Sequence, residues 1–183
     1  MLKSLEERKI IGEFDRALDN EEFVMFLQPQ VDYEGYPYGA EALVSWQHPK
    51  RGLRSPGIFI DALEKNGFVY RLDIYMWNKA AKQLSEWKKR GIEKYHISVN
   101  ISTKDFYLID VYETFTSLVE KYDISPKLLK LEITETALMS DFDKNILIIK
   151  KLQDYGFDIE IDDFGSGYSS LNMLKDISAD VLK

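Results

Sequence analysis

The sequence contains no cysteine and only two histidines among its 183 residues. Without cysteine the chain has no disulfide, no thiolate metal site and no cysteine nucleophile, which suits a reducing compartment. No apolar run approaches the roughly 20 residues that span a membrane, and the charged N-terminus lacks the apolar core of a signal peptide. We therefore expect a cytoplasmic protein, or the cytoplasmic part of a longer membrane-anchored one.

Basic residues are outnumbered by acidic ones, 24 to 31, so the formal net charge is −7 at pH 7. This balance argues against a protein that binds nucleic acid through bulk electrostatic attraction. It leaves open a small phosphate-bearing ligand that is held by metal ions. The length of 183 residues, 45% of them hydrophobic, is enough for one domain with a sizeable core.

The N-terminal part of the sequence predicts a helix followed by a β-hairpin. Apolar residues recur at helical spacing over residues 4–18. Strands are expected at 23–30 and 39–46, with a turn at 32–37 between them. Because this connection is so short, the two strands are expected to run antiparallel.

From residue 55 onward, helices and strands alternate. Ser55-Pro56 is a typical helix start, and an apolar stripe from Leu72 to Trp87 predicts a helix that Gly91 ends. The later elements are expected in this order: strand 95–101, helix near 110–122, strand 129–134, helix near 141–155 ended by Gly156, strand 158–162, a short helix from about 168, and strand 180–183. The alternation predicts an α/β fold with a largely parallel sheet of six strands, as in an incomplete β/α barrel.

Side chains with oxygen donors recur at the ends of the expected strands. The steps from Asn100 to Glu132 and from Glu132 to Asp162 are 32 and 30 residues, about one βα unit each. Alternate strand residues point to opposite faces, so these side chains share a face with other polar residues while the opposite face is apolar. Glu41 lies on the corresponding face of strand 39–46. The pattern predicts that the polar side chains converge at the mouth of a barrel.

The converging side chains are candidate metal ligands: Glu41, Asn100, Glu132, Asp162 and Asp163. Hard oxygen ligands select Mg²⁺, Mn²⁺ or Ca²⁺ rather than zinc. The adjacent pair Asp162-Asp163 could bridge two ions, an arrangement that suits in-line attack on phosphorus. The alternative is that these carboxylates are salt-bridged, solvated or capping groups.

Two further candidate features follow the acidic pair in sequence, and two further candidate residues, Glu135 and His96, precede it. Residues 164–170 form a glycine-rich turn into a helix, whose backbone N–H groups favour anions. Lys183 could orient a nucleophilic water or neutralise phosphate charge, although it could also be a solvated lysine. Glu135 could organise the site or be only a loop charge, and His96 could hydrogen-bond inside the barrel.

Five motifs in this order carry a resemblance to a known family. They are Gln28-Pro29-Gln30-Val31-Asp32, Ala40-Glu41-Ala42-Leu43-Val44-Ser45-Trp46, Ser98-Val99-Asn100-Ile101-Ser102, Leu131-Glu132-Ile133-Thr134-Glu135-Thr136 and Asp162-Asp163-Phe164-Gly165-Ser166-Gly167-Tyr168-Ser169-Ser170-Leu171. With them the chain resembles an EAL domain, the bacterial phosphodiesterase that opens cyclic di-GMP to linear pGpG. The resemblance implies a (β/α)8 TIM-like barrel whose first strand is antiparallel.

The resemblance also implies roles for individual residues. Two Mg²⁺ or Mn²⁺ ions are expected, the first held by Glu41, Asn100, Glu132 and Asp162 and the second reached by Asp162 and Asp163. Lys183 is expected beside the attacking water, and Glu135 is expected to brace the loop that carries the acidic pair. The residues expected at the substrate are Gln28, Leu43, Ser45 and Asp163.

The chain departs from the family pattern in two respects. Ser45 stands where active members usually have an arginine that contacts a substrate phosphate, so weaker binding is expected. The family also continues past Lys183 with two more strands, a metal-binding glutamate and a substrate-binding glutamine. We therefore expect a linker helix at 1–20 and, at 21–183, an EAL domain that lacks its C-terminal strands and has an incomplete second metal site, with weak or no turnover.

Several functions are compatible with this reading. A phosphodiesterase would form a homodimer controlled by an upstream GGDEF or sensor domain. A non-catalytic receptor would bind cyclic di-GMP and signal through its N-terminal helix, and a structural dimerisation module would bind no nucleotide. Another Mg²⁺-dependent barrel enzyme, such as one of the enolase type, would lack nucleotide-specific cleavage.

Overall fold

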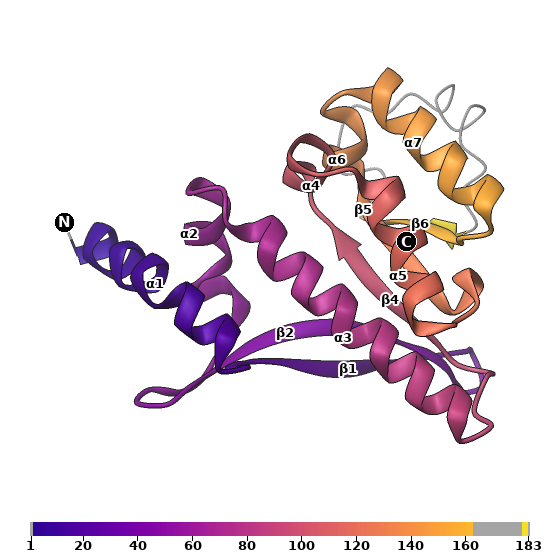
Figure 1. The fold of residues 1–183 in the computed structure, drawn as a ribbon, viewed down its shortest axis with the longest axis horizontal. Coiled ribbons are helices and arrows are strands. Elements are labelled where there is room, and N and C mark those ends of the chain that lie inside the picture. The colour runs from indigo at the N-terminus through magenta and orange to yellow at the C-terminus, as the bar shows by residue number, and fades with distance from the viewer. Residues whose placement is uncertain (1, 163–180, 183) are drawn as a thin grey trace.

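A seven-stranded mixed sheet is the framework of the computed structural model, which describes residues 2–162 and 181–182 (Figure 1). The strands are β1 (Phe23–Val31), β2 (Pro37–His48), β3 (Gly52–Arg54), β4 (His96–Ile101), β5 (Leu129–Thr134), β6 (Ile159–Asp162) and β7 (Val181–Leu182). The α-helices are α1 (Leu2–Asp19), α2 (Ile60–Lys65), α3 (Val69–Lys89), α4 (Thr103–Leu108), α5 (Val111–Tyr122), α6 (Glu135–Met139) and α7 (Phe142–Tyr155).

The strand order is β1-β2-β4-β5-β6-β7, with β3 paired to β2. Strand β1 runs antiparallel to β2, whereas β2, β4, β5, β6 and β7 are mutually parallel. The α/β fold and the antiparallel first strand are therefore as the sequence predicts. Within the described residues the sheet is not closed, because β1 and β7 each pair on one side only.

The expected elements are corrected in several details. The predicted count of six strands misses β3, because the three residues of Gly52–Arg54 are too few to show strand periodicity. The proline at residue 56 begins a 3-10 turn, Pro56–Ile58, and α2 starts only at Ile60. The short helices α4 and α6 are also additional to the expected elements. The short helix expected from about residue 168 lies outside the described residues.

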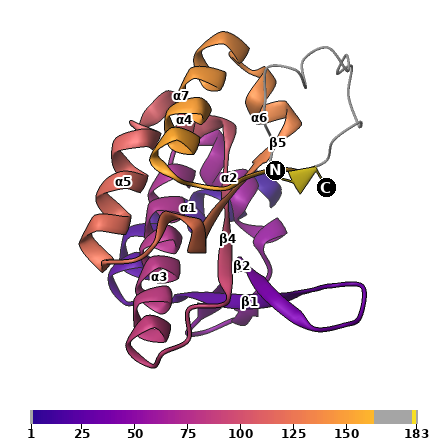
Figure 2. The ribbon, with the colours of Figure 1, turned by 90° about the vertical axis from the view of Figure 1, so that its right-hand side faces the viewer.

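Alternation along the central strands separates an apolar face from a polar one. Ile97, Val99 and Ile101 of β4 are buried, as are Leu129, Leu131 and Ile133 of β5. They share a core with residues of α3, α5 and α7. Figure 2 shows α3 and α5 on one side of β4. Since the helices take the apolar face, the polar side chains of the same strands point away from them.

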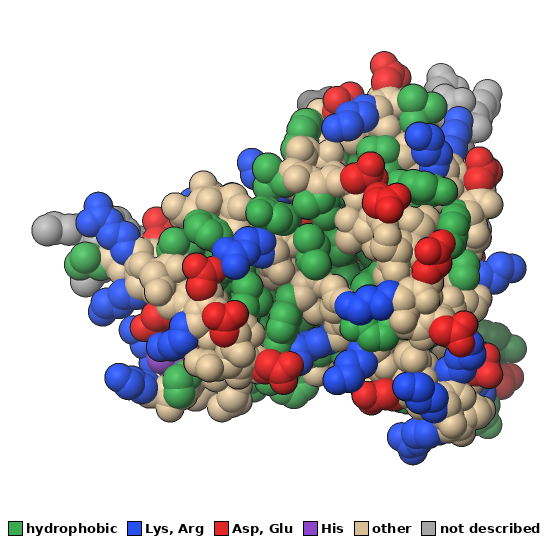
Figure 3. All heavy atoms as spheres, viewed as in Figure 1, with side chains coloured by type: hydrophobic (Ala, Val, Ile, Leu, Met, Phe, Trp, Pro, Cys, Tyr) green, Lys and Arg blue, Asp and Glu red, His purple; other side chains and the backbone are tan. Residues whose placement is uncertain are grey.

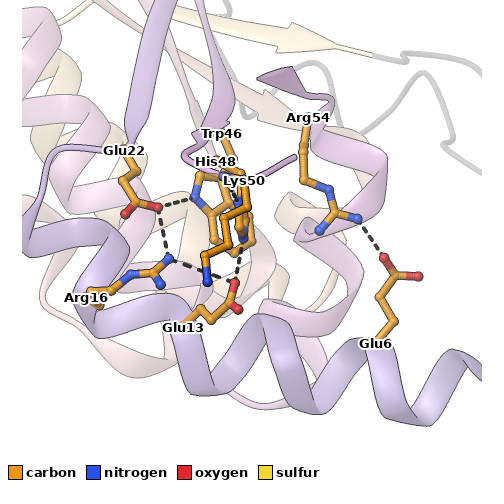
Figure 4. Close-up of polar contacts among 8 residues, drawn as sticks. All are labelled: Glu6, Glu13, Arg16, Glu22, Trp46, His48, Lys50 and Arg54. Carbon is orange, nitrogen blue, oxygen red and sulfur yellow. Dashed lines mark hydrogen bonds and ion pairs between the residues drawn. The ribbon is translucent and has the colours of Figure 1, made fainter. Parts of the chain in front are cut away.

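Helix α1 is attached to the rest of the chain by a core contact and by several polar contacts. Its residues Ile10, Phe14 and Ala17 are buried in a cluster that also contains Phe23 and Trp46. Its polar contacts are drawn in Figure 4: Glu13 Oε2 lies 2.8 Å from His48 Nε2, Glu6 Oε1 lies 2.6 Å from Arg54 NH2, and Arg16 NH2 lies 3.2 Å from Glu22 Oε2. Glu22, which follows the helix, accepts in turn from Trp46 Nε1 at 2.9 Å. The predicted linker helix therefore packs against strands β2 and β3. The division at residue 20 stays a prediction.

Among the described residues, no helix is both long and apolar enough to cross a membrane. On the face shown in Figure 3, acidic and basic side chains are interspersed and do not form a region of one sign. This face therefore carries no basic patch of the kind that binds nucleic acid through its phosphates.

Candidate functional site

The strand register brings the predicted oxygen ligands to one edge of the sheet. Asn100 and Glu132 are Cα partners on the neighbouring strands β4 and β5. Asp162 is the partner of Thr134, so it lies two residues further toward the carboxyl end than Glu132. Parallel strands place their carboxyl ends together, which is why residues about 30 apart in sequence meet here.

Glu41 joins this group from strand β2. Its Oε1 accepts a hydrogen bond from Asn100 Nδ2 at 3.0 Å. The backbone of Asn100 is fixed in turn, because Trp77 Nε1 of α3 donates to its carbonyl oxygen at 3.0 Å. The pairing of β2 with β4 ends at Glu41 and Ser98, so this contact lies where the two strands begin to separate.

Glu132 is the most deeply buried of these acids, with 2% of its surface exposed. Its Oε1 accepts a hydrogen bond at 3.2 Å from Nε2 of Gln30, a residue of β1. The amide oxygen of Gln30 lies 2.7 Å from His96 Nε2. The expectation that His96 hydrogen-bonds inside the barrel is thereby confirmed.

Lys130 and Glu160 form a polar pair on the same interior face, between the neighbouring strands β5 and β6. Lys130 Nζ lies 3.2 Å from Glu160 Oε1, and Ser98 Oγ donates to Glu160 Oε2 at 3.4 Å. Glu160 is 2% exposed and Ser98 is fully buried. A buried carboxylate is stable only when it is hydrogen-bonded and paired with an opposite charge, and the ammonium group of Lys130 supplies the positive charge for Glu160.

The remaining predicted site residues fall into four groups. Gln28 faces Glu41 as its antiparallel partner, so the two side chains share a face of the hairpin. Leu43 and Ser45 follow Glu41 on β2 at alternate positions, and both are partly buried. Glu135 is buried at the first residue of α6. Asp163 and Lys183 lie outside the described residues.

The donor set fits a hard divalent cation. Glu41 and Glu132 carry carboxylate oxygens, and the amide of Asn100 carries Oδ1, all of the type that Mg²⁺ and Mn²⁺ prefer. Within residues 2–162 and 181–182, no three acid or histidine side chains form a ready metal-binding group. The described residues thus supply part of the predicted ligand set, and Asp163 belongs to the part of the chain that is not described.

A pocket of about 340 Å³ opens beside Asn100, between the ends of β2 and β4 and the helices α2 and α3. Its lining is mostly apolar, including Leu43, Val44, Met76 and Trp77. Two acidic side chains, Glu64 and Asp73, also line it, as do three hydroxyl side chains, Ser102, Thr103 and Thr134. Apolar pockets with a few polar groups are typical ligand sites.

Asp73, which lines this pocket, is buried beside a second carboxyl group, that of Asp105. Burial raises the pKa of Asp73 well above its ordinary value, and the neighbouring Asp105 carboxylate raises it further. Burial also raises the pKa of Asp105 to about 6, although hydrogen bonds from Ser102 oppose that rise. Asp105 is tied to the start of α4, because Ser102 N and Ser102 Oγ donate to its Oδ2 at 2.7 and 2.8 Å. A proton shared by the two carboxyl groups therefore stabilises the folded state, because it removes one of two buried like charges.

The sign of this effect gives a testable pH dependence. Since the folded-state pKa values lie above the ordinary value of 3.8, the free energy of unfolding is expected to fall as the pH rises from about 4 through 6 and beyond. Asp73→Asn removes one of the two like charges and keeps the side-chain shape. We expect it to flatten this pH dependence and to stabilise the protein at pH 7 to 8 by on the order of 1–3 kcal/mol.

Urea unfolding at a series of pH values measures this prediction, with Asp61→Asn at an exposed position of α2 as the matched control. An Asp73→Asn protein whose stability depends on pH as steeply as that of the unchanged chain would contradict it.

Asp73 and Asp105 are not among the predicted site residues, and Gln30 is predicted only as part of a motif, without a role of its own. A signal for Asp73 was present, because it lies four residues after Val69 and three before Met76, both of which are buried. An acid on the apolar stripe of a helix indicates a buried carboxyl group. Gln30 carried no such signal, since only the folded sheet brings its side chain next to His96 of β4 and Glu132 of β5.

Comparison with known proteins places these features in a family. The EAL domain family model matches residues 11–183. MucR of Pseudomonas aeruginosa, described as a bifunctional diguanylate cyclase/cyclic di-GMP phosphodiesterase, is 34% identical over 179 residues, which are 97% of this chain and 26% of MucR. The cyclic di-GMP phosphodiesterase NbdA of the same organism is 31% identical over 184 residues, covering 100% of this chain and 24% of NbdA.

Solved structures agree with this similarity. The PaMucR phosphodiesterase in complex with c-di-GMP has a TM-score of 0.90 at 33% identity, covering 95% of this chain and 71% of that one. The EAL domain of Xanthomonas citri FimX in complex with c-diGMP shares the fold, with a TM-score of 0.87 at 19% identity. The chain spans about a quarter of the length of the curated relatives it matches. From the extent of the family match, the chain belongs to the EAL domain family.

Proposed function

We propose that the domain to which this chain belongs binds cyclic di-GMP and hydrolyses it to linear pGpG with two Mg²⁺ or Mn²⁺ ions. The observation that carries the proposal is the meeting of Glu41, Asn100 and Glu132 at the carboxyl edge of the sheet. The relatives named as cyclic di-GMP phosphodiesterases and the PaMucR complex with c-di-GMP support it.

Each group of residues has a defined part in the proposed reaction. Glu41, Asn100, Glu132 and Asp162 would hold one ion, and Asp162 with Asp163 would reach the second. Divalent ions bound there lower the pKa of water and neutralise the charge that develops on a phosphate. Lys183 would orient the water that adds to phosphorus, and one phosphorus–oxygen ester bond would break, its oxygen leaving as a hydroxyl.

The pocket beside Asn100 would take one guanosine half of the dinucleotide. Its apolar walls, Leu43 and Val44 among them, suit the face of a base, and Glu64 offers a carboxylate to the N–H groups at a base edge. Gln28, next to Glu41, would contact the substrate from β1. Glu135, buried at the start of α6, would brace the segment that carries Asp163.

A non-catalytic receptor is the second candidate, and Ser45 favours it. A serine at this position of β2 cannot make the charge-assisted phosphate contact that the family's arginine makes. The receptor would use the same pocket and transmit binding through α1, which contacts β2 through Glu13 and β3 through Glu6.

Assembly and context are further parts of the proposal. We infer an upstream regulatory domain, because the matched relatives are several times longer than this chain and MucR is named as bifunctional. The homodimer is proposed from the family resemblance alone. A cytoplasmic location follows from the nucleotide ligand. Light scattering with and without cyclic di-GMP would measure the oligomeric state.

The test is a calorimetric titration of cyclic di-GMP into the chain with Mn²⁺ and then with chelator, while chromatography follows the linear dinucleotide. Metal-dependent cleavage supports the phosphodiesterase. Binding without cleavage, in this chain and in one extended through the rest of the EAL domain, supports the receptor. No binding in either protein contradicts both and leaves a structural module or another barrel enzyme.

A further inference from the structure

Gln30 bridges two buried polar side chains across the interior of the sheet. Its Nε2 donates to Glu132 Oε1 at 3.2 Å, and its Oε1 lies 2.7 Å from Nε2 of His96. A carboxylate only accepts hydrogen bonds, so the amide nitrogen of Gln30 must face Glu132. The amide oxygen then faces His96, which must donate from Nε2 and therefore carries its proton there.

The chain makes room for this arrangement at Gly39. A Cβ atom at this residue would lie 2.3 Å from Cε1 and Nε2 of the His96 ring, far inside van der Waals contact. Gly39 is the Cα partner of Gln30 on one side and of His96 on the other. The missing side chain of β2 thus lets the imidazole of β4 reach past β2 to Gln30 on β1.

Gln30 also connects this bridge to Ser98 on β4 and, through Ser98, to Glu160 on β6. Its Nε2 lies 3.4 Å from Ser98 Oγ, which in turn donates to Glu160. His96 is 7% exposed and Glu132 is 2% exposed, so both ends of the bridge are shielded from water. A hydrogen bond in such a place has well-defined geometry, because water does not compete for either partner.

We propose that Gln30 is a positioning residue: it holds the carboxylate of Glu132 in the orientation needed to bind the metal ion, and His96 fixes the orientation of the Gln30 amide. The inference rests on the proposed function, in which Glu132 is a metal ligand. Residues that hydrogen-bond a metal ligand set its orientation, and their loss lowers metal affinity by about 10- to 100-fold.

Gln30→Met tests the bridge, because methionine has nearly the length of glutamine and neither donates nor accepts a strong hydrogen bond. Mn²⁺ binding to the full chain is measured from the electron paramagnetic resonance signal of free Mn²⁺. We expect Gln30→Met to raise the Kd for Mn²⁺ about 10- to 100-fold. Gln47→Met, at an exposed position of β2, is the matched control and is expected to leave the Kd unchanged.

A second measurement reads His96 directly and needs no metal. The chain has only two histidines, so the ¹⁵N spectrum of its imidazoles contains two sets of signals. His96 is expected to be protonated at Nε2 and to lose this preference in Gln30→Met. His48 is the internal control: its Nδ1 accepts from Lys50 N at 3.0 Å and its Nε2 contacts Glu13, far from the substitution in sequence.

The outcomes separate this inference from the proposed function. Unchanged Mn²⁺ affinity in a folded Gln30→Met protein, with tight binding by the unchanged chain, overturns the positioning role and leaves the function standing. Absence of Mn²⁺ binding by the unchanged chain overturns the metal site and the positioning role together. If Gln30→Met does not fold, Gly39→Ala displaces the His96 ring and is expected to weaken Mn²⁺ binding and shift the His96 signals, and no change in either overturns the inference.

Discussion

Glu132→Gln is expected to weaken Mn²⁺ binding by more than about 100-fold, because removing a ligand costs more than removing a residue that only orients one. The substitution keeps the shape of the side chain and an oxygen that can accept from Gln30, so the hydrogen bond seen at 3.2 Å is not the interaction being removed. What is lost is the negative charge of a carboxylate that is 2% exposed. Hydrolysis of cyclic di-GMP is expected to fall by a similar factor at limiting Mn²⁺.

Calorimetric titration of Mn²⁺ and chromatography of the dinucleotide product measure the two effects. Glu86→Gln, at an exposed position of α3, is the matched control and is expected to change neither. If Glu132→Gln bound Mn²⁺ as tightly as the unchanged chain, Glu132 would not be a ligand. Its burial would then serve the interior network of hydrogen bonds alone.

Ser45→Arg is expected to tighten the binding of cyclic di-GMP roughly 10- to 150-fold. A hydrogen bond to a charged group contributes about 1.5–3 kcal/mol, and each 1.4 kcal/mol is a factor of ten in Kd. Ser45 lies on β2 four residues beyond Glu41 and alternates in phase with it, so a longer side chain there would extend over the face that carries Glu41. The gain should shrink as salt is added, since part of it is charge attraction.

Ser45→Met separates the charge from the added length and is expected to give no gain. The basic residues Lys50 and Arg51 lie in the turn between β2 and β3 and are both exposed. Should one of them already contact the phosphate, Ser45→Arg would add little, and Arg51→Ala or Lys50→Ala in the unchanged chain would weaken binding instead. Equal affinity in all of these proteins would show that no phosphate contact is made from this part of β2.

The polar edge of the sheet was predictable because strand geometry is a local property. Period-two alternation puts Asn100 with Ser98 and His96, and Glu132 with Lys130, on one face of their strands. The apolar residues between them, such as Val99 and Leu131, must then be buried by helices. Only the spacing of about one βα unit was needed to infer that the strands are parallel and that their carboxyl ends coincide.

Other features could not be predicted, for reasons that are also physical. Strand β3 exists because Leu53 and Arg54 find partners on β2, and three residues have no periodicity of their own. Helix α1 showed an apolar stripe, but the stripe does not reveal what it packs on. Its residue Glu13 contacts His48, which is 35 residues away in sequence, and its residue Phe14 shares a buried cluster with Trp46, so both contacts depend on the completed hairpin.

Local periodicity and short motifs were therefore enough to predict the fold class, the family and the face on which the candidate ligands lie. Which side chains touch depends on the packing of the whole chain. That packing placed Gln30 between His96 and Glu132, opened that space at Gly39, and buried Asp73 against Asp105. Such contacts join residues on different strands and helices, and their distances are set by how whole elements pack against one another rather than by the order of residues within any one of them.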